Sequence, residues 1–354
     1  MREISGRELP DMARGAAVLG TGGGGDPYVG RLLAEEAVRR HGPVRLVAVD
    51  EVPDDAVVVP TAFMGAPTVL VEKVPSGTET TRALRMVEEL IGRRATHTVS
   101  IEAGGLNSMI PVAAAAELGL PLIDADGMGR AFPELQMLLP TLGGVAASPM
   151  ALADERGNTL GLRAVDNGWA ERLARTVTVE MGCSAGISLY VLTGRQVKDH
   201  LVRGTMTLCE RLGRAIRQAT DAHTDPVRAA ADILSGRLVF TGKVTDVRRR
   251  TEGGFARGEA LLDGLGDHAG HGMELAFQNE HLVARRDGGV VVSVPDLICV
   301  LDTDSGAPVT TEALRYGMRV SVVGAPCDER WRTPEGLALA GPAYFGYDHV
   351  YVPV

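Results

Sequence analysis

The sequence has few aromatic residues, few cysteines and no long hydrophobic run. Aromatic side chains make up only 4% of the 354 residues, so their cluster between Trp331 and Tyr347 predicts that this end of the chain packs back onto the body of the protein. The four cysteines are scattered without zinc-finger spacing, which indicates reduced thiols rather than disulfides. No stretch of about 18 uncharged apolar residues occurs, and no apolar segment follows the N-terminal charges. We therefore expect neither a membrane span nor a signal peptide, and a cytoplasmic location.

Long runs of one charge sign are also missing. The formal net charge is −9, and lysine and arginine are spread along the chain, which argues against a nucleic-acid groove or a membrane-surface patch. With 45% hydrophobic residues, the chain is long enough to bury two cores. These properties predict a globular protein whose partner is a small molecule.

What the sequence does have is a run of four glycines, within Leu19–Pro27 (Leu-Gly-Thr-Gly-Gly-Gly-Gly-Asp-Pro). Such a run is costly in a helix or strand, so it marks a close approach of backbone to something else. Asp26 is a good N-cap, Pro27 suits the first helical position, and residues 28–40 have helical spacing. A helix N-terminus can hold a carboxylate, a phosphate or an oxyanion. We expect this loop to bind substrate through Thr21, Gly22, Gly23, Gly24, Gly25 and Asp26; the alternative is a flexible turn between helices.

The glycine loop does not match the usual nucleotide-binding signatures. It lacks the Gly-Lys-Ser/Thr ending of a P-loop, and residues 8–19 before it have helical spacing, whereas a dinucleotide fingerprint follows a strand. We therefore expect no nucleotide cofactor.

The first half of the chain alternates helical and strand patterns, as an α/β domain does. Short apolar runs predict strands, and helices are expected between them, at the ranges 44–49, 56–63, 98–102 and 120–124 for strands and 79–93 and 106–118 for helices. Polar residues and glycines gather after the strands, where open α/β sheets have their ligand crevice. Met64, Gly65 and Asn107 are accordingly predicted to bind substrate.

The second half changes from helical to strand-like character. Residues 168–234 read as largely helical, with one long helix at 195–218, and strands are predicted at 237–248, 258–262, 273–286, 290–294, 296–301 and 318–323. The predicted division is an α/β domain at 1–165, a helical segment at 166–234 that packs on it, and a barrel-like β domain at 235–354. The polar residues at 278–280 interrupt an apolar strand, which predicts an interdomain hydrogen bond or a ligand contact.

Three carboxylates follow the predicted buried strands: Glu102, Asp124 and Asp126. Two close carboxylates can be driven to different pKa values, so one can act as a base while another holds a metal. A divalent metal such as zinc would take Asp124, Asp126 and His200 as ligands. The alternative is that the two aspartates cap a strand end and a turn.

Cys183 lies between two glycines, where a thiol can gain thiolate character. It is a candidate nucleophile or metal ligand, and the alternative is a buried cysteine that acts as a small hydrophobe. His268 and His271 lie in a glycine-rich turn that reads as a solvated loop; the alternative is that the pair binds a metal.

Several of these motifs together resemble the DUF917 family, also called the S-methyl-thiohydantoin desulfurase-like family. The motifs lie at 19–27, 63–67, 102–111, 124–134, 277–280 and 331–336 and so extend over nearly the whole chain. The resemblance implies an N-terminal three-layer α/β domain and a C-terminal β-barrel-like domain. It also implies an association with hydantoinase/oxoprolinase proteins and chemistry on a five-membered cyclic amide, imide or thiohydantoin.

The function predicted from the sequence is a hydrolase that cleaves a C–N or C–S bond of such a ring. Asp124, Asp126 or Glu102 would activate water, directly or through a metal, and Asn107 would orient the carbonyl. Two alternatives stay open: an accessory subunit of a hydantoinase-type complex, and a nucleotide-dependent enzyme. We also expect a homo-oligomer, with a hydantoinase-type protein as a further partner.

Overall fold

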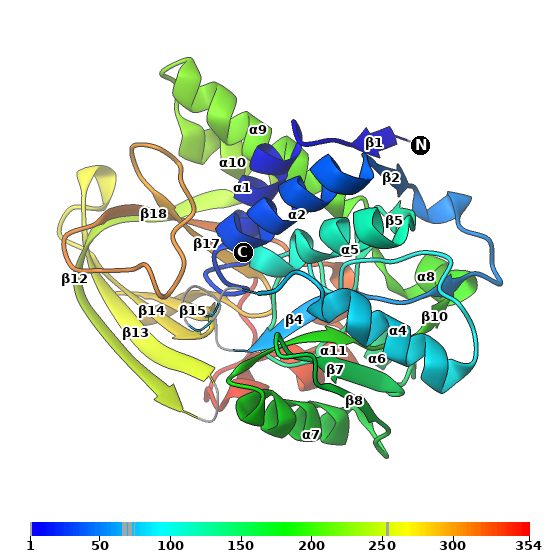
Figure 1. Cartoon of the computed structure of the whole chain (residues 1–354). Coiled ribbons are helices and arrows are strands. Elements are labelled where there is room, and N and C mark those ends of the chain that lie inside the picture. Colours follow the sequence, from blue (N-terminus) through cyan, green and yellow to red (C-terminus); the bar gives the residue numbers. More distant parts are fainter. Residues whose placement is uncertain (1, 66–68, 70–72, 74, 253–254) are drawn as a thin grey trace.

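The computed structural model describes residues 2–65, 69, 73, 75–252 and 255–354. It has an N-terminal part of mixed helices and small sheets and a C-terminal curled sheet of seven strands, whose long members β12 and β13 form one flank of the molecule (Figure 1). The predicted fold class, an α/β domain followed by a barrel-like β domain, is confirmed.

Two helices enclose the glycine run. Helix α1 (Leu9–Leu19) ends directly before it, and α2 (Pro27–His41) begins directly after it, with Pro27 in the first turn. The Asp26 side chain accepts a hydrogen bond of 2.8 Å from the Tyr28 backbone N–H and so caps α2. The predicted arrangement of helix, glycine loop and capped helix is confirmed.

The N-terminal part contains a three-stranded sheet, a four-stranded sheet and two pairs of short strands. The three-stranded sheet has the order β1-β2-β5 and the four-stranded sheet the order β4-β9-β7-β8. Their elements are β1 (Arg2–Ile4), β2 (Val44–Val47), β3 (Val57–Val58), β4 (Thr61–Gly65), α4 (Glu79–Ile91), α5 (Ile110–Leu118), β5 (Leu122–Ile123), β6 (Ala125–Asp126), α6 (Leu139–Leu142), β7 (Met150–Ala153) and β8 (Thr159–Leu162). The predicted strand 56–63 is thus two strands, β3 and β4.

The segment predicted as a strand at 98–102 is not one. It forms a single bridge, between Thr98 and Leu122. The chain then bends, because polar groups of the segment form local hydrogen bonds: the Ser100 hydroxyl donates to the Glu102 carbonyl at 2.6 Å. Glu102 therefore lies in a loop.

The middle of the chain mixes helices with strands that belong to the N-terminal sheets. The elements are α7 (Asn167–Glu180), β9 (Ser184–Ser188), β10 (Leu192–Thr193), α8 (Gly194–His200), β11 (Val202–Arg203), α9 (Thr205–Asp221) and α10 (Pro226–Ile233). Strand β9 pairs with β4 and with β7. The single helix predicted at 195–218 is two helices, because the chain turns at Gly204 with φ 74°. The domain boundaries proposed from the sequence stay a prediction.

The C-terminal sheet is antiparallel throughout, in the order β16-β15-β14-β13-β12-β18-β17. Its strands are β12 (Arg237–Glu252), β13 (Phe255–Gly264), β14 (Gly272–Gln278), β15 (Glu280–Arg286), β16 (Gly289–Ser293), β17 (Leu297–Asp302) and β18 (Arg319–Ala325), and the short helix α11 (Pro334–Ala340) follows them. The strand predicted at 273–286 is wrong as one element: the chain reverses at Asn279, at φ 57°, so β14 and β15 form a tight hairpin.

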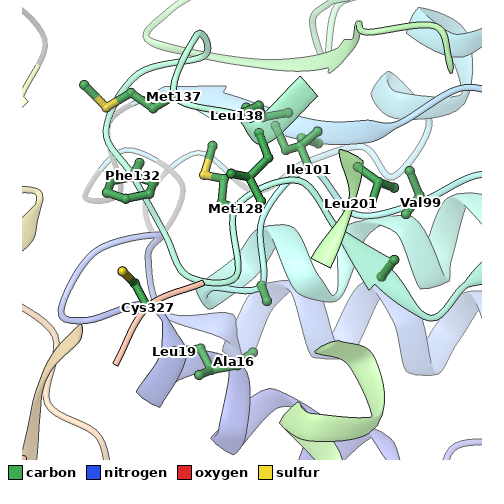
Figure 2. Close-up of a cluster of buried hydrophobic side chains, with 14 of the residues drawn as sticks. Ala16, Leu19, Val99, Ile101, Met128, Phe132, Met137, Leu138, Leu201 and Cys327 are labelled. Carbon is green, nitrogen blue, oxygen red and sulfur yellow. The ribbon is translucent and has the colours of Figure 1, made fainter. Parts of the chain in front are cut away.

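The largest cluster of buried side chains joins both parts of the molecule (Figure 2). Phe132 and Met128 of the N-terminal part meet the fully buried Trp331, whose indole N–H donates to the Met128 carbonyl at 2.8 Å and whose ring lies 4.8 Å from that of Phe132. This contact confirms the predicted packing of the aromatic C-terminal segment. Among the described residues, no helix is long and apolar enough to cross a membrane.

Candidate active site

A cleft of about 70 Å³ lies where the glycine loop, the end of β4 and the β14–β15 turn meet. Its walls come from both parts of the chain: Gly24, Phe63, Met64, Gly65, Ile101, Glu102, Leu106, Asn107, Met128, Phe132, Pro133, Glu134, Leu135, Arg175, Asn279 and Glu280. Four residues predicted to bind substrate, namely Gly24, Met64, Gly65 and Asn107, are among them. Ala66 and Pro67, which belong to one of the sequence motifs, lie outside the described residues.

Glu102 is a buried carboxyl group on one wall of the cleft, with 5% of its surface exposed. Asn107 donates from Nδ2 to Glu102 Oε1 at 2.7 Å, while its Oδ1 accepts the Phe63 backbone N–H at 2.7 Å. Burial raises the pKa of Glu102 to about 8, and the charge of Asp126 adds to the rise, against the hydrogen bond from Asn107. Asn107 thus fixes the carboxyl group to the end of β4.

Glu280 is the second buried carboxyl group of the cleft, with 2% exposed. Burial raises its pKa well above the usual value, and the charge of Glu102 raises it further. The Arg130 cation and a hydrogen bond from the Gly24 backbone N–H oppose this rise. Its Oε2 atom has no partner among the described residues. The cleft therefore holds two electrostatically coupled carboxyl groups, one from each part of the chain.

The glycine loop lies directly against β15. A Cβ atom on Gly23 would overlap Glu280 Oε1, and one on Gly22 would come within 2.6 Å of His281 Cδ2. Gly22, Gly24 and Gly25 also have positive φ angles, of 91°, 71° and 75°. The close approach that the glycines predicted thus occurs, and the group that the loop approaches at Gly23 is the Glu280 carboxyl of the protein itself.

The other loop residues predicted to bind substrate lie outside the cleft wall. Thr21 is fully buried and its Oγ1 accepts from Arg130 Nη2 at 2.8 Å. Asp26 caps α2, and Gly25 packs its carbonyl against Gly105. These residues shape the loop, and their direct contact with a substrate stays a prediction.

Arg130 is a fully buried cation beneath the cleft. Its Nη1 donates to the carbonyl oxygens of Pro295 and Asp296 at 2.8 and 2.7 Å, and its Nε donates to the Ala131 carbonyl at 3.0 Å. Its guanidinium also lies 4.6 Å from the centre of the Phe132 ring. Arg130 therefore joins the two parts of the chain and places positive charge near Glu280.

The two aspartates proposed as base or metal ligands use their carboxylates for backbone hydrogen bonds. Asp126 Oδ2 accepts from the N–H groups of Ala103, Met128 and Gly129 at 2.7–2.9 Å. Asp124 accepts from the backbone N–H and hydroxyl of Thr207, near the start of α9. Neither lines the cleft. Burial raises the pKa of Asp126 to about 6, and its charge acts on Glu102.

Cys183 and His200 also lie away from the cleft wall. Cys183 is half-buried at φ 63°, with its carbonyl against Gly65. The His200 ring packs on Gly143, and its carbonyl accepts from Arg330 Nη1 at 2.7 Å. In the part of the chain that the structure describes, no three His, Cys, Asp or Glu side chains are grouped to hold a metal. The hypothesis that Cys183 is a nucleophile stays a prediction. The zinc site also stays a prediction, and the described residues offer no set of ligands for it.

Four residues of this region were not predicted as site residues from the sequence: Glu134 and Glu280, which line the cleft, and Arg130 and His281, which are fully buried outside its lining. His281 is fully buried against the glycine loop, neither of its ring nitrogens has a partner among the described residues, and burial, with the Arg130 charge, lowers its pKa to about 3. Glu280 carried a signal, since it belongs to the polar run that interrupts an apolar pattern, and Arg130 and Glu134 belong to the motif at 124–134.

Comparisons with known proteins agree over the whole chain. The model for the S-Me-THD-like N-terminal domain matches residues 7–164, and the model for the S-Me-THD-like C-terminal domain matches residues 165–354. A crystal structure of a protein from Chromobacterium violaceum superposes with a TM-score of 0.84 at 27% identity and covers 100% of both chains. No curated protein sequence matches.

Proposed function

This chain belongs to the S-Me-THD-like (S-methyl-thiohydantoin desulfurase-like) family, and we propose that it is a hydrolase that cleaves a C–S or C–N bond of a small five-membered cyclic amide or thiohydantoin. The observation that carries the proposal is the pair of buried carboxyl groups, Glu102 and Glu280, in one small cleft. The family supports a thiohydantoin-related activity, and the pair supports acid–base hydrolysis.

The pair is suited to general acid–base catalysis because ionising both buried carboxyl groups at once is energetically unfavourable. Burial raises the pKa of Glu280, and the negative charge of an ionised Glu102 raises it further. We therefore propose that the first proton to leave the pair comes from Glu102, whose pKa is about 8. Near neutral pH the cleft then holds a carboxylate at Glu102 in a fraction of the molecules and a carboxylic acid at Glu280. These are a base and an acid held on opposite walls.

In the proposed reaction, Glu102 takes a proton from water as the water oxygen bonds to the ring carbon that carries the sulfur. The C–S bond then breaks, its electron pair stays on sulfur, and sulfur takes the proton of Glu280 and leaves as a thiol. For a C–N substrate, the ring nitrogen takes that proton instead. Proton transfer from Glu102 back to Glu280 restores the starting state, so the reaction consumes one water.

The two alternative functions have less support from the site. An accessory subunit would need no pair of buried acids, whose burial is unfavourable for the fold. A nucleotide-dependent enzyme would need its glycine loop open to phosphates, whereas here the loop packs directly against Glu280 and His281. A hydantoinase-type partner, a homo-oligomer and a cytoplasmic location stay predictions.

The test is hydrolysis of S-methylthiohydantoin, thiohydantoin, hydantoin and 5-oxoproline by the purified chain. We expect turnover of at least one ring, and a loss of kcat of at least about 100-fold in both Glu102→Gln and Glu280→Gln, the usual scale for a general acid or base. Glu134→Gln is the matched control, because Glu134 lines the same cleft but its carboxylate already accepts from Gln136 and the Tyr344 hydroxyl. Full activity in Glu102→Gln or in Glu280→Gln would overturn the assignment of the acid and the base.

A further inference from the structure

A second and larger cavity, of about 540 Å³, lies on the C-terminal sheet outside the candidate active site. It lies over strands β12 to β15, and its lining includes Phe345 and Tyr347 of the C-terminal segment. It lies on the face away from the sheet's own core, because Leu275 belongs to that core while its neighbours Glu274 and Ala276 line the cavity. We call it the arginine groove, since its walls include Arg248, Arg249, Arg250, Arg257 and Arg285.

Two of the five arginines in the arginine groove are each paired with a glutamate across the sheet. Arg248 lies directly opposite Glu259 and donates to it at 3.1 Å. Arg285 lies opposite Glu274 and donates to it at 2.5 Å. These cross-strand pairs are the ordinary way in which a sheet balances charge on one face.

One row of the groove is not balanced in this way. Arg250 and Arg257 lie directly opposite each other in the β12–β13 ladder, and like charges in that position destabilise a sheet. The side chain of Arg257 makes no hydrogen bond or ion pair with any described residue, although its backbone pairs with both neighbouring strands. Among the described residues, the Arg250 side chain is paired only with Glu252, at 3.0 Å, and both side chains of that pair are well exposed, at 74% and 59%. Such surface pairs contribute little stability.

The uncompensated charge lies in a chain whose formal net charge is −9, so a general excess of basic residues does not explain it. Two arginines directly opposite each other on adjacent strands have Cβ atoms about 5 Å apart, so their guanidinium groups can reach one shared anion. A phosphate monoester carries about −1.5 to −2 charges at neutral pH and offers three acceptor oxygens, whereas a monocarboxylate offers one charge. The row therefore matches a phosphate better than a carboxylate.

The groove continues from the Arg250–Arg257 row to an aromatic wall. Phe345 and Tyr347 are half-buried there, and the Arg285 guanidinium lies 5.7 Å from the Tyr347 ring centre. Because the nearby charges of Arg285 and Glu274 neutralise each other, this end favours a flat, uncharged group. We propose that the arginine groove binds a small phosphate ester with an aromatic or heterocyclic group, its phosphate between Arg250 and Arg257 and its ring against Tyr347.

The experiment is calorimetric titration of the full chain with phenyl phosphate, inorganic phosphate and benzoate at low ionic strength. We expect phenyl phosphate to bind more tightly than either other probe, because it alone supplies both the charge and the ring. Arg257→Gln is expected to weaken phenyl phosphate about tenfold, the scale of one lost charge-assisted hydrogen bond. Tyr347→Ala is expected to remove the preference for phenyl phosphate over inorganic phosphate.

The matched control is Arg286→Gln, which removes an exposed arginine of the same sheet that does not line the groove. It is expected to leave the binding of all three probes unchanged. An equal loss in Arg286→Gln and Arg257→Gln would show a diffuse charge effect and overturn the proposal, as would equal binding of benzoate and phenyl phosphate. Binding that persists in Glu102→Gln separates this result from the proposed hydrolase activity.

Discussion

Replacing the carboxyl group of Glu102 with an amide is expected to stabilise the protein while it removes activity. Glu102 is 5% exposed, and burial raises its pKa from 4.5 to about 8. A raised folded-state pKa means that the acid's contribution to stability is complete below pH 4.5 and is lost as the pH rises through about 8. Glutamine resembles the neutral acid at every pH, so Glu102→Gln escapes this loss.

The size of the effect follows from the same two pKa values. One pKa unit corresponds to about 1.4 kcal/mol, so the wild-type protein at pH 7 has lost about 3 kcal/mol of unfolding free energy at this site relative to acid conditions. Between pH 6 and pH 8 the advantage of Glu102→Gln is expected to grow by about 2 kcal/mol. The quantity to measure is the change with pH in the difference in unfolding free energy between Glu102→Gln and wild type. Any hydrogen bond that the amide fails to make lowers this difference equally at pH 6 and at pH 8.

The assay is urea unfolding at pH 6, 7 and 8, with the two proteins compared at each pH. Glu134→Gln serves as the control, and its difference from wild type is expected to stay constant over this range. A difference between Glu102→Gln and wild type that does not grow with pH would refute the reasoning, since it would mean that Glu102 is already ionised at pH 6 in the folded protein.

Two further predictions concern the same carboxyl pair. The value of kcat/KM is expected to rise with pH toward about 8 as Glu102 ionises and to fall at higher pH as Glu280 loses its proton; a flat profile from pH 6 to 9 would contradict the acid–base roles. Gly23→Ala is expected to lower stability by about 1–3 kcal/mol and to reduce kcat, because the new Cβ overlaps the Glu280 carboxyl group, whereas Gly6→Ala, with nothing within 4 Å, is expected to change neither in thermal melts and rate assays.

The sequence predicted those parts of the fold that depend on local chemistry. Four consecutive glycines at 22–25 disfavour regular structure, and an Asp-Pro pair sets a helix start, so the loop and α2 were both predictable. The strands of the C-terminal sheet follow from apolar alternation with glycine turns. The turn at Asn279 was missed because apolar residues continue on both sides of it, although asparagine tolerates the left-handed conformation found there.

The candidate site was only half predictable, because it forms between segments far apart in the chain. Glu102 and Asn107 were identified as polar residues after an apolar run, and both line the cleft. Asp124 and Asp126 carry the same local signal, but their carboxylates turn toward backbone N–H groups that only the folded loops bring near. Local spacing cannot separate a carboxylate that holds a loop together from one that faces a cleft.

Arg130 explains how this fold tolerates two buried acids in one cleft. Its hydrogen bonds go to backbone carbonyls and a hydroxyl, and none of the described carboxylates forms an ion pair with it, so its positive charge is left to act on the cleft through space. Arginine keeps its proton at any working pH. This charge favours the carboxylate form of Glu280, against burial and the charge of Glu102, whereas the charge of Asp126 raises the pKa of Glu102. Arg130 thus offsets part of the cost of ionising one carboxyl group of the pair, and acid–base hydrolysis requires one ionised and one protonated group.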